Sequence, residues 1–232
     1  MIRFFPIILA VLTIYGLAQS PESGQYQTKF ENDVVAVYQL NLAAHASAST
    51  LQSAHDTFWV SLTDSSLSFS REQQSKGDVR WQPGDTRFFP SFETNLLTNT
   101  GATEFRGVII ALKPRGLISG ACDCAGSTSK TICGCKGGTH LESLWALSLG
   151  SVTLAGTSLS AGESFRAAAL RDDMLLVAVT NITLTDLGTQ DSDSAGLPGL
   201  RLKSGDAIWI VGGRHQFKNV GNELARFVTF EF

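Results

Sequence analysis

The sequence predicts an all-β protein built as two similar halves, and three observations support this. Short apolar runs rich in β-branched and aromatic residues recur along the chain with turn residues between them. Their spacing, roughly 8–12 residues, is typical of a β-sandwich or barrel. No long helical period stands out between these runs. Three blocks of the first half return in the same order in the second half, which indicates a duplication.

Nine runs carry the strand prediction. In chain order they are 34–42, 57–62, 66–69, 105–112, 144–149, 174–179, 181–184, 207–211 and 225–232. The stretch 163–177 has the Ala and Leu content of a helix. Its end aligns with a strongly β-rich segment of the first half, so we expect a strand there. The acidic stretch 186–199 is predicted to be a solvated loop.

The two halves align with nearly one offset. The aligned blocks are 56–67 with 173–184 (offset 117), 77–90 with 198–211 (offset 121), and 99–110 with 219–230 (offset 120). Each half has the length of a common single domain. Because three blocks keep their order and spacing, we expect the halves to share one topology.

The N-terminus has the pattern of a secretory signal peptide. Residues 1–18 combine Arg3, an apolar run and the small residues Gly16 and Ala18 before a predicted cut. The apolar run is about 14 residues long, whereas a membrane-spanning helix needs about 20. We therefore expect the mature protein to be secreted or periplasmic, without a membrane contact after cleavage. An uncleaved anchor is the alternative.

Composition and motifs exclude several function classes. Hydrophobic residues make up 43% of the 232 residues and charged residues 17%, with a net charge of −3. Without a run of Lys and Arg there is no electrostatic support for nucleic-acid binding. No G-x-S-x-G elbow indicates a hydrolase, and no glycine-rich phosphate loop indicates a nucleotide cofactor.

All four cysteines lie in one short segment, CDCAGSTSKTICGC. In an antiparallel hairpin, Cys122 would face Cys135 and Cys124 would face Cys133, all on one side. An oxidising compartment then favours two nested disulfides. The opposite disulfide connectivity, a zinc site of four thiolates, and free or redox-active thiols, active in thiol exchange, remain alternatives.

The repeated Gly-Asp block has a distinctive spacing. In the second half, Gly205 and DAIWI are followed by Val211, His215 and, after QFK, Asn219. The corresponding first-half positions are Gly84, Pro90, Asn95 and Asn99. This pattern resembles the second motif of the cupin superfamily, Gly-x5-Pro-x-Gly-x2-His-x3-Asn. The resemblance implies two tandem cupin barrels of the jelly-roll, or double-stranded β-helix, type.

The resemblance also implies metal chemistry for many cupins, but this sequence departs from the family at the ligand positions. The first cupin motif supplies ligands through His-x-His and a Glu. Besides His215, the ligand positions fall at Ala168, Leu170, Met174, Leu51, Ser53, Thr57 and Asn95. A catalytic metal needs about three protein ligands. We therefore expect no cofactor and no metal site.

These observations predict an exported cupin-like module and favour a binding or structural role over an enzymatic one. The candidate ligand-binding residues are His215, Arg214 and Asn219, for a small molecule of unknown identity. The alternative is a metal-dependent cupin enzyme of the oxygenase or isomerase type, with an atypical site of His215 and His55 or Glu163. Cupins often form dimers, so the resemblance allows a homodimer.

The predicted organisation has five parts. They are a signal peptide (1–18), a flexible leader (19–32), a first cupin-like barrel (33–113), a Cys-rich hairpin connector (114–141) and a second cupin-like barrel (142–232).

Overall fold

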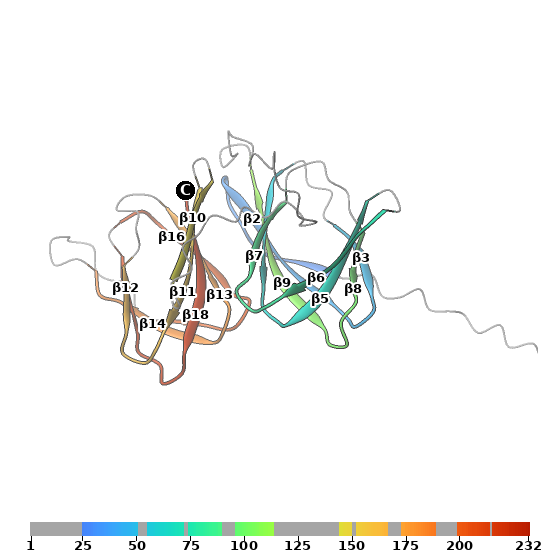
Figure 1. Cartoon of the computed structure of the whole chain (residues 1–232). Helices are drawn as coiled ribbons and strands as arrows, with labels where there is room; N and C mark the ends of the chain where they lie inside the picture. Colours follow the sequence, from blue (N-terminus) through green and yellow to red (C-terminus); the bar gives the residue numbers. More distant parts are fainter. Residues whose placement is uncertain are drawn as a thin grey trace, which may run out of the picture.

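The computed structural model contains strands and no helix in the part of the chain that it describes (Figure 1). The described residues are 25–50, 55–71, 74–89, 96–113, 144–149, 152–166, 173–188, 199–213 and 215–232. The four cysteines and Arg214 lie outside them. Over the described ranges, no helical segment has the length and apolarity to cross a membrane.

The first half forms two antiparallel sheets. Its strands are β1 (Gln25–Glu31), β2 (Val35–Leu42), β3 (Ser47–Ser49), β4 (Thr57–Ser61), β5 (Ser65–Arg71), β6 (Gln74–Trp81), β7 (Thr86–Phe89), β8 (Leu96–Asn99) and β9 (Phe105–Leu112). The five-stranded sheet has the order β1-β2-β9-β4-β7, and the four-stranded sheet has the order β3-β8-β5-β6.

The second half repeats this arrangement strand for strand. Its strands are β10 (Leu144–Leu149), β11 (Val152–Leu159), β12 (Ser164–Arg166), β13 (Met174–Ala178), β14 (Ile182–Asp186), β15 (Leu200–Leu202), β16 (Ala207–Ile210), β17 (Gln216–Asn219) and β18 (Ala225–Glu231). Its sheets have the orders β10-β11-β18-β13-β16 and β12-β17-β14-β15. The prediction of an all-β protein with two tandem jelly-roll barrels is confirmed.

The chain enters the first sheet earlier than the sequence predicts. Part of the predicted leader, Gln25–Glu31, forms β1 and pairs with β2. A register shift between Thr28 and Phe30 reverses the direction of the side chains. Tyr26 therefore packs inside the first barrel, while Phe30 packs on the outer face of the sheet. The polar composition of this segment and its irregular alternation hide the strand from sequence analysis.

The two five-stranded sheets pack against each other through their outer faces. In Figure 1 the blue-to-green strands of the first half and the yellow-to-red strands of the second half stand side by side. One buried cluster joins them, with eight members from the first half and seven from the second. The rings of Phe58 and Phe230 lie 5.5 Å apart within it. This shared core should couple the unfolding of the two halves.

Two arginines related by the repeat reach across this interface in the same way. Arg106 Nη2 donates a hydrogen bond to the carbonyl oxygen of Ser204 at 3.4 Å. In the opposite direction, a Cβ added to Gly84 would lie 4.0 Å from Arg226 Nη2. Gly84 and Gly205 both have a φ of +91° in these turns, where glycine is favoured. The pseudo-twofold relation of the halves thus extends to single side chains.

Another pair of equivalent turns gives a stability prediction. His45 has a φ of +61°, and its counterpart Gly162 has a φ of +81°. Both backbone N–H groups donate to the carbonyl of the repeated asparagine, Asn99 or Asn219. The left-handed conformation costs an L residue about 1–2 kcal/mol, part of which the greater chain entropy of glycine offsets. We expect His45→Gly to raise the free energy of unfolding by about 0.5–1 kcal/mol in urea denaturation.

The reverse change is its control. A Cβ at Gly162 would meet no atom within 4 Å, so only backbone strain changes there. Gly162→His should lower the free energy of unfolding by about 1 kcal/mol. If both substitutions changed the free energy of unfolding equally and in the same direction, this interpretation would be contradicted.

Candidate functional site

The interior of the first barrel is filled by aromatic side chains. Its buried core includes five rings, of Trp59, Phe69, Trp81, Phe89 and Phe105. Trp59 contacts Phe69 and Phe89 with centroid distances of 6.2 and 5.1 Å. The guanidinium of Arg87 lies 4.6 Å from the centroid of Trp81. Burial lowers the pKa of Arg87, and the charge of Asp85 opposes this shift.

The second barrel has smaller or more polar side chains at several of the same inward positions. The strand registers match Tyr38 with Ala155, Leu40 with Thr157, Ile109 with Thr229, Ala111 with Glu231, Trp59 with Leu176, and Phe89 with Ile210. Three aromatic rings are replaced by Ala, Leu and Ile, and two apolar side chains by threonine. The second interior therefore has fewer aromatic rings and more polar side chains than the first.

A polar layer crosses this interior. Thr229 and Glu231 follow Phe227 on β18 at steps of two, so they share its inward face. Thr157 lies opposite Phe227 on β11. All three polar side chains are at most 5% exposed. Among the described residues, Thr157 Oγ1 finds no hydrogen-bond partner. A buried hydroxyl in that state costs free energy that a bound polar group can recover.

His215 lies where β17 begins, at one end of the same barrel. Its Nδ1 lies 2.7 Å from Asp186 Oδ2, and its Nε2 lies 3.0 Å from the carbonyl oxygen of Val211. Its ring stacks on Phe217 with a centroid distance of 5.8 Å. Both contacts are to acceptors, so both form together only when each ring nitrogen carries a proton.

Asp186 holds this histidine in place. Its side chain is 2% exposed. Asp186 Oδ1 accepts hydrogen bonds from the backbone N–H groups of Gly188 and Gln216, at 3.0 and 3.1 Å. The prediction of a solvated loop beginning at this residue is therefore wrong for Asp186, which ends strand β14. The carboxylate positions both the imidazole and the start of β17.

Asn219, the second candidate, serves the backbone. Its Nδ2 donates to the carbonyl oxygens of Leu159 and Glu223, and its Oδ1 accepts from the N–H of Gly221. Asn99 makes equivalent bonds to Leu42, Thr103 and Gly101, and a further one to Ala43. Both amide hydrogens of Asn219 are thus used by the turn, and its role as a ligand-binding residue stays a prediction. The third candidate, Arg214, lies outside the described residues.

Comparison with known proteins identifies the architecture. No protein-family model matches the chain, and no curated protein matches its sequence. A cupin 2 barrel domain protein from Leptotrichia buccalis matches 90% of this chain and 89% of its own at 8% identity, with a TM-score of 0.51. A variant of the Bacillus subtilis oxalate decarboxylase OxdC covers 90% of this chain and 72% of its own, at 11% identity and a TM-score of 0.61.

A vicilin from Corylus avellana (hazelnut) covers 91% of this chain and 84% of its own, at 12% identity and a TM-score of 0.57. These matches span both halves. The chain has the bicupin fold. At such identities the likeness establishes the fold alone, and the matched structures include a decarboxylase as well as a vicilin.

The bicupin fold separates the donors that the enzyme alternative requires. Glu163 Oε2 accepts a hydrogen bond from the N–H of Ser160 in the turn beside Asn219. It therefore lies at the opposite end of β17 from His215. His55 precedes β4 in the first barrel. Within the described ranges, no three His, Cys, Asp or Glu side chains form a group that could hold a metal ion.

Of the polar residues gathered at this interior, the sequence motif indicates one, and its role in ligand binding stays a prediction. His215 follows from the motif, whereas Asp186, Thr157, Thr229 and Glu231 do not. Asp186 is 29 residues from His215, and only the pairing of β14 with β17 brings them together. The other three are visible in the sequence as differences between the halves, where Leu40, Ile109 and Ala111 become polar. The similarities between the halves, which predict the fold, do not reveal these differences.

Proposed function

We propose that the protein is an exported bicupin that binds a small polar molecule inside its second barrel and carries no catalytic metal. The observation that carries this proposal is the buried, unpartnered hydroxyl of Thr157 in an interior with fewer aromatic rings than the first barrel. A ligand oxygen or nitrogen would supply the missing hydrogen bond. Neighbouring apolar side chains would shield that bond from water.

The position of His215 supports a binding role rather than a metal site. A metal-bound imidazole directs a nitrogen lone pair at the ion. Here both ring nitrogens already contact oxygen atoms, of Asp186 and Val211. The fixed imidazole and carboxylate form a polar end to the barrel that can orient a ligand. The enzyme alternative requires His215 to exchange one of these contacts for a metal and two further donors to approach it.

The binding role is tested by giving the second barrel the residues of the first. Thr157→Leu with Thr229→Ile installs the side chains found at Leu40 and Ile109. We expect at least one member of a panel of hydroxy acids and monosaccharides to bind the wild type in calorimetric titrations. That ligand should bind this double variant at least tenfold more weakly. Thr157→Ser with Thr229→Ser keeps both hydroxyls and should retain binding.

Stability gives a second readout of the same site. Thr157→Val removes the unpartnered hydroxyl at nearly constant volume, so the free energy of unfolding should rise by about 1 kcal/mol. The binding role would be contradicted if no compound of the panel bound the wild type. It would also be contradicted if the Thr157→Leu, Thr229→Ile variant bound the same compound as tightly as the wild type.

Elemental analysis tests the absence of a catalytic metal. Protein purified without a metal-affinity step should contain far less than one transition-metal ion per chain. About one tightly held ion per chain, lost together with an activity on His215→Ala, would favour the enzyme instead.

A further inference from the structure

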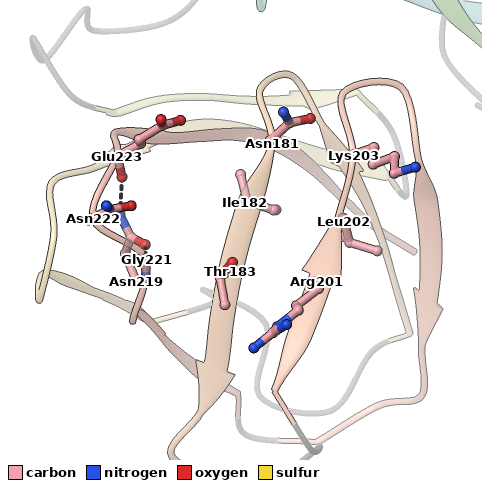
Figure 2. Close-up of a pocket in the computed structure, with 10 residues that line it drawn as sticks. All are labelled: Asn181, Ile182, Thr183, Arg201, Leu202, Lys203, Asn219, Gly221, Asn222 and Glu223. Carbon is pink, nitrogen blue, oxygen red and sulfur yellow. Dashed lines mark hydrogen bonds between the residues drawn. The ribbon is translucent and has the colours of Figure 1, made fainter.

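A pocket of about 260 Å³ opens at the end of the second barrel opposite His215. Figure 2 shows its walls, which come from the start of β14, from β15, and from the turn that follows β17. Asn181 directly precedes β14, and Asp186 is its last residue. At about 3.3 Å per residue, the two residues are about 16 Å apart along the strand. The pocket therefore lies at the end of β14 away from the pair of Asp186 and His215.

The lining is rich in groups that bind polar ligands. It combines the charged side chains of Arg201, Lys203 and Glu223 with the amides of Asn181 and Asn222. All five residues are exposed. None of the three charged side chains forms an ion pair with another described residue. Within the described part of the chain, the pocket thus presents two cations and one anion that no ion pair engages.

The pocket has a fixed frame. Asn219 holds the turn through Glu223 and Gly221, as the dashed line in Figure 2 shows for the first of these bonds. The N–H groups of Val220 and Gly221 donate to the carbonyl oxygen of Thr183. Asn181 Oδ1 accepts from the N–H of Ser204 at 3.0 Å, which leaves its NH₂ group to donate elsewhere. A ligand here would meet a backbone frame that is already in position.

The repeat shows that the duplicated fold does not itself require these side chains. Arg80 corresponds to Arg201, but the counterparts of Lys203, Asn222 and Glu223 are Gln82, Ala102 and Thr103. In the first half, Thr103 Oγ1 donates to the carbonyl oxygen of Asp64 at 3.4 Å and ties the equivalent turns together. In the second half, Glu223 occupies that place. The turn geometry and one arginine are common to both halves, whereas Lys203, Asn222 and Glu223 belong to the second.

We propose that this pocket binds a small acidic sugar, such as a uronic acid. Arg201 and Lys203 would pair with the carboxylate, and Arg suits the planar geometry of that group. Glu223 would accept hydrogen bonds from sugar hydroxyls, and the two asparagine amides can both donate and accept. The volume is below the roughly 300 Å³ of the smallest drug-sized sites, which limits the ligand to about one sugar ring.

NMR titration with D-glucuronate tests this proposal. In ¹H–¹⁵N spectra of the wild type, amide signals of residues 181–183, 201–203 and 219–223 should shift in a saturable way. Arg201→Ala with Lys203→Ala should weaken binding at least tenfold. The matched control is Arg80→Ala with Gln82→Ala, at the corresponding first-half positions, and it should bind like the wild type. Both pairs are on β-strand ends whose backbone bonds the substitutions leave in place.

Three results would overturn the proposal. They are a wild type without saturable shifts, glucose binding as well as glucuronate, and sulfate binding as tightly as glucuronate, which would indicate a plain anion site. The Thr157→Leu, Thr229→Ile variant separates this pocket from the barrel interior. It should keep glucuronate binding here, even where binding inside the barrel is lost.

Discussion

Phe230→Ala is expected to lower the free energy of unfolding by about 3–5 kcal/mol. Phe230 is fully buried on the outer face of β18, between the two five-stranded sheets. Its ring contacts Phe58 of the first half at a centroid distance of 5.5 Å. The substitution removes apolar contacts and leaves a cavity that two rigid sheets cannot close. Denaturation in urea, followed by tryptophan fluorescence and circular dichroism, measures the loss.

The same experiment tests whether the halves unfold together. Because fifteen residues from both halves share the buried cluster, the wild type should unfold in one transition by both probes. Leu224→Ala is the control, because Leu224 is 50% exposed. It should change the free energy of unfolding by no more than about 0.5 kcal/mol. Two separate transitions in the wild type, or a loss below about 1 kcal/mol in Phe230→Ala, would contradict a cooperative interface.

The repeat in the sequence predicts the fold well because it marks the turns. Gly84 and Gly205 share one left-handed φ, and Asn99 and Asn219 share one set of backbone hydrogen bonds. Such positions tolerate few other residues, so they stay recognisable after the strands between them have diverged. This is why offsets of 117–121 residues correctly predict two halves of one topology, whose sheets have matching strand orders.

The candidate site is less predictable, since it depends on how the halves differ. Exchanging Leu40 for Thr157, or Ala111 for Glu231, is a small change in sequence. Its meaning appears only when the strand registers place both threonines and Glu231 on the inward face. His45 against Gly162 is a similar case, because only the backbone angle reveals the strain. Tertiary pairing likewise decides the partner of His215, which no local pattern indicates.

Asn219→Ala is expected to lower the free energy of unfolding by about 3 kcal/mol. Asn219 is 1% exposed. Its amide makes three hydrogen bonds, to the backbone of Leu159, Gly221 and Glu223, at 2.8–3.0 Å. The substitution removes all three bonds and leaves the buried carbonyl of Leu159 without this partner, which alone costs about 1–3 kcal/mol, while the N–H of Gly221 keeps its bond to Thr183. Urea denaturation of the variant measures the loss.

Two further variants decide between a structural and a ligand-binding role for this residue. Asn222→Ala removes an exposed amide three positions along the same turn and should change stability by no more than about 0.5 kcal/mol. Asn99→Ala breaks the equivalent bonds in the first barrel and should cost about as much as Asn219→Ala. A loss below about 1 kcal/mol in Asn219→Ala, with weaker ligand binding, would instead make Asn219 a binding residue. The first barrel has no histidine at the matching motif position. Equal losses in the two halves would therefore show that the turn itself requires the asparagine of the motif.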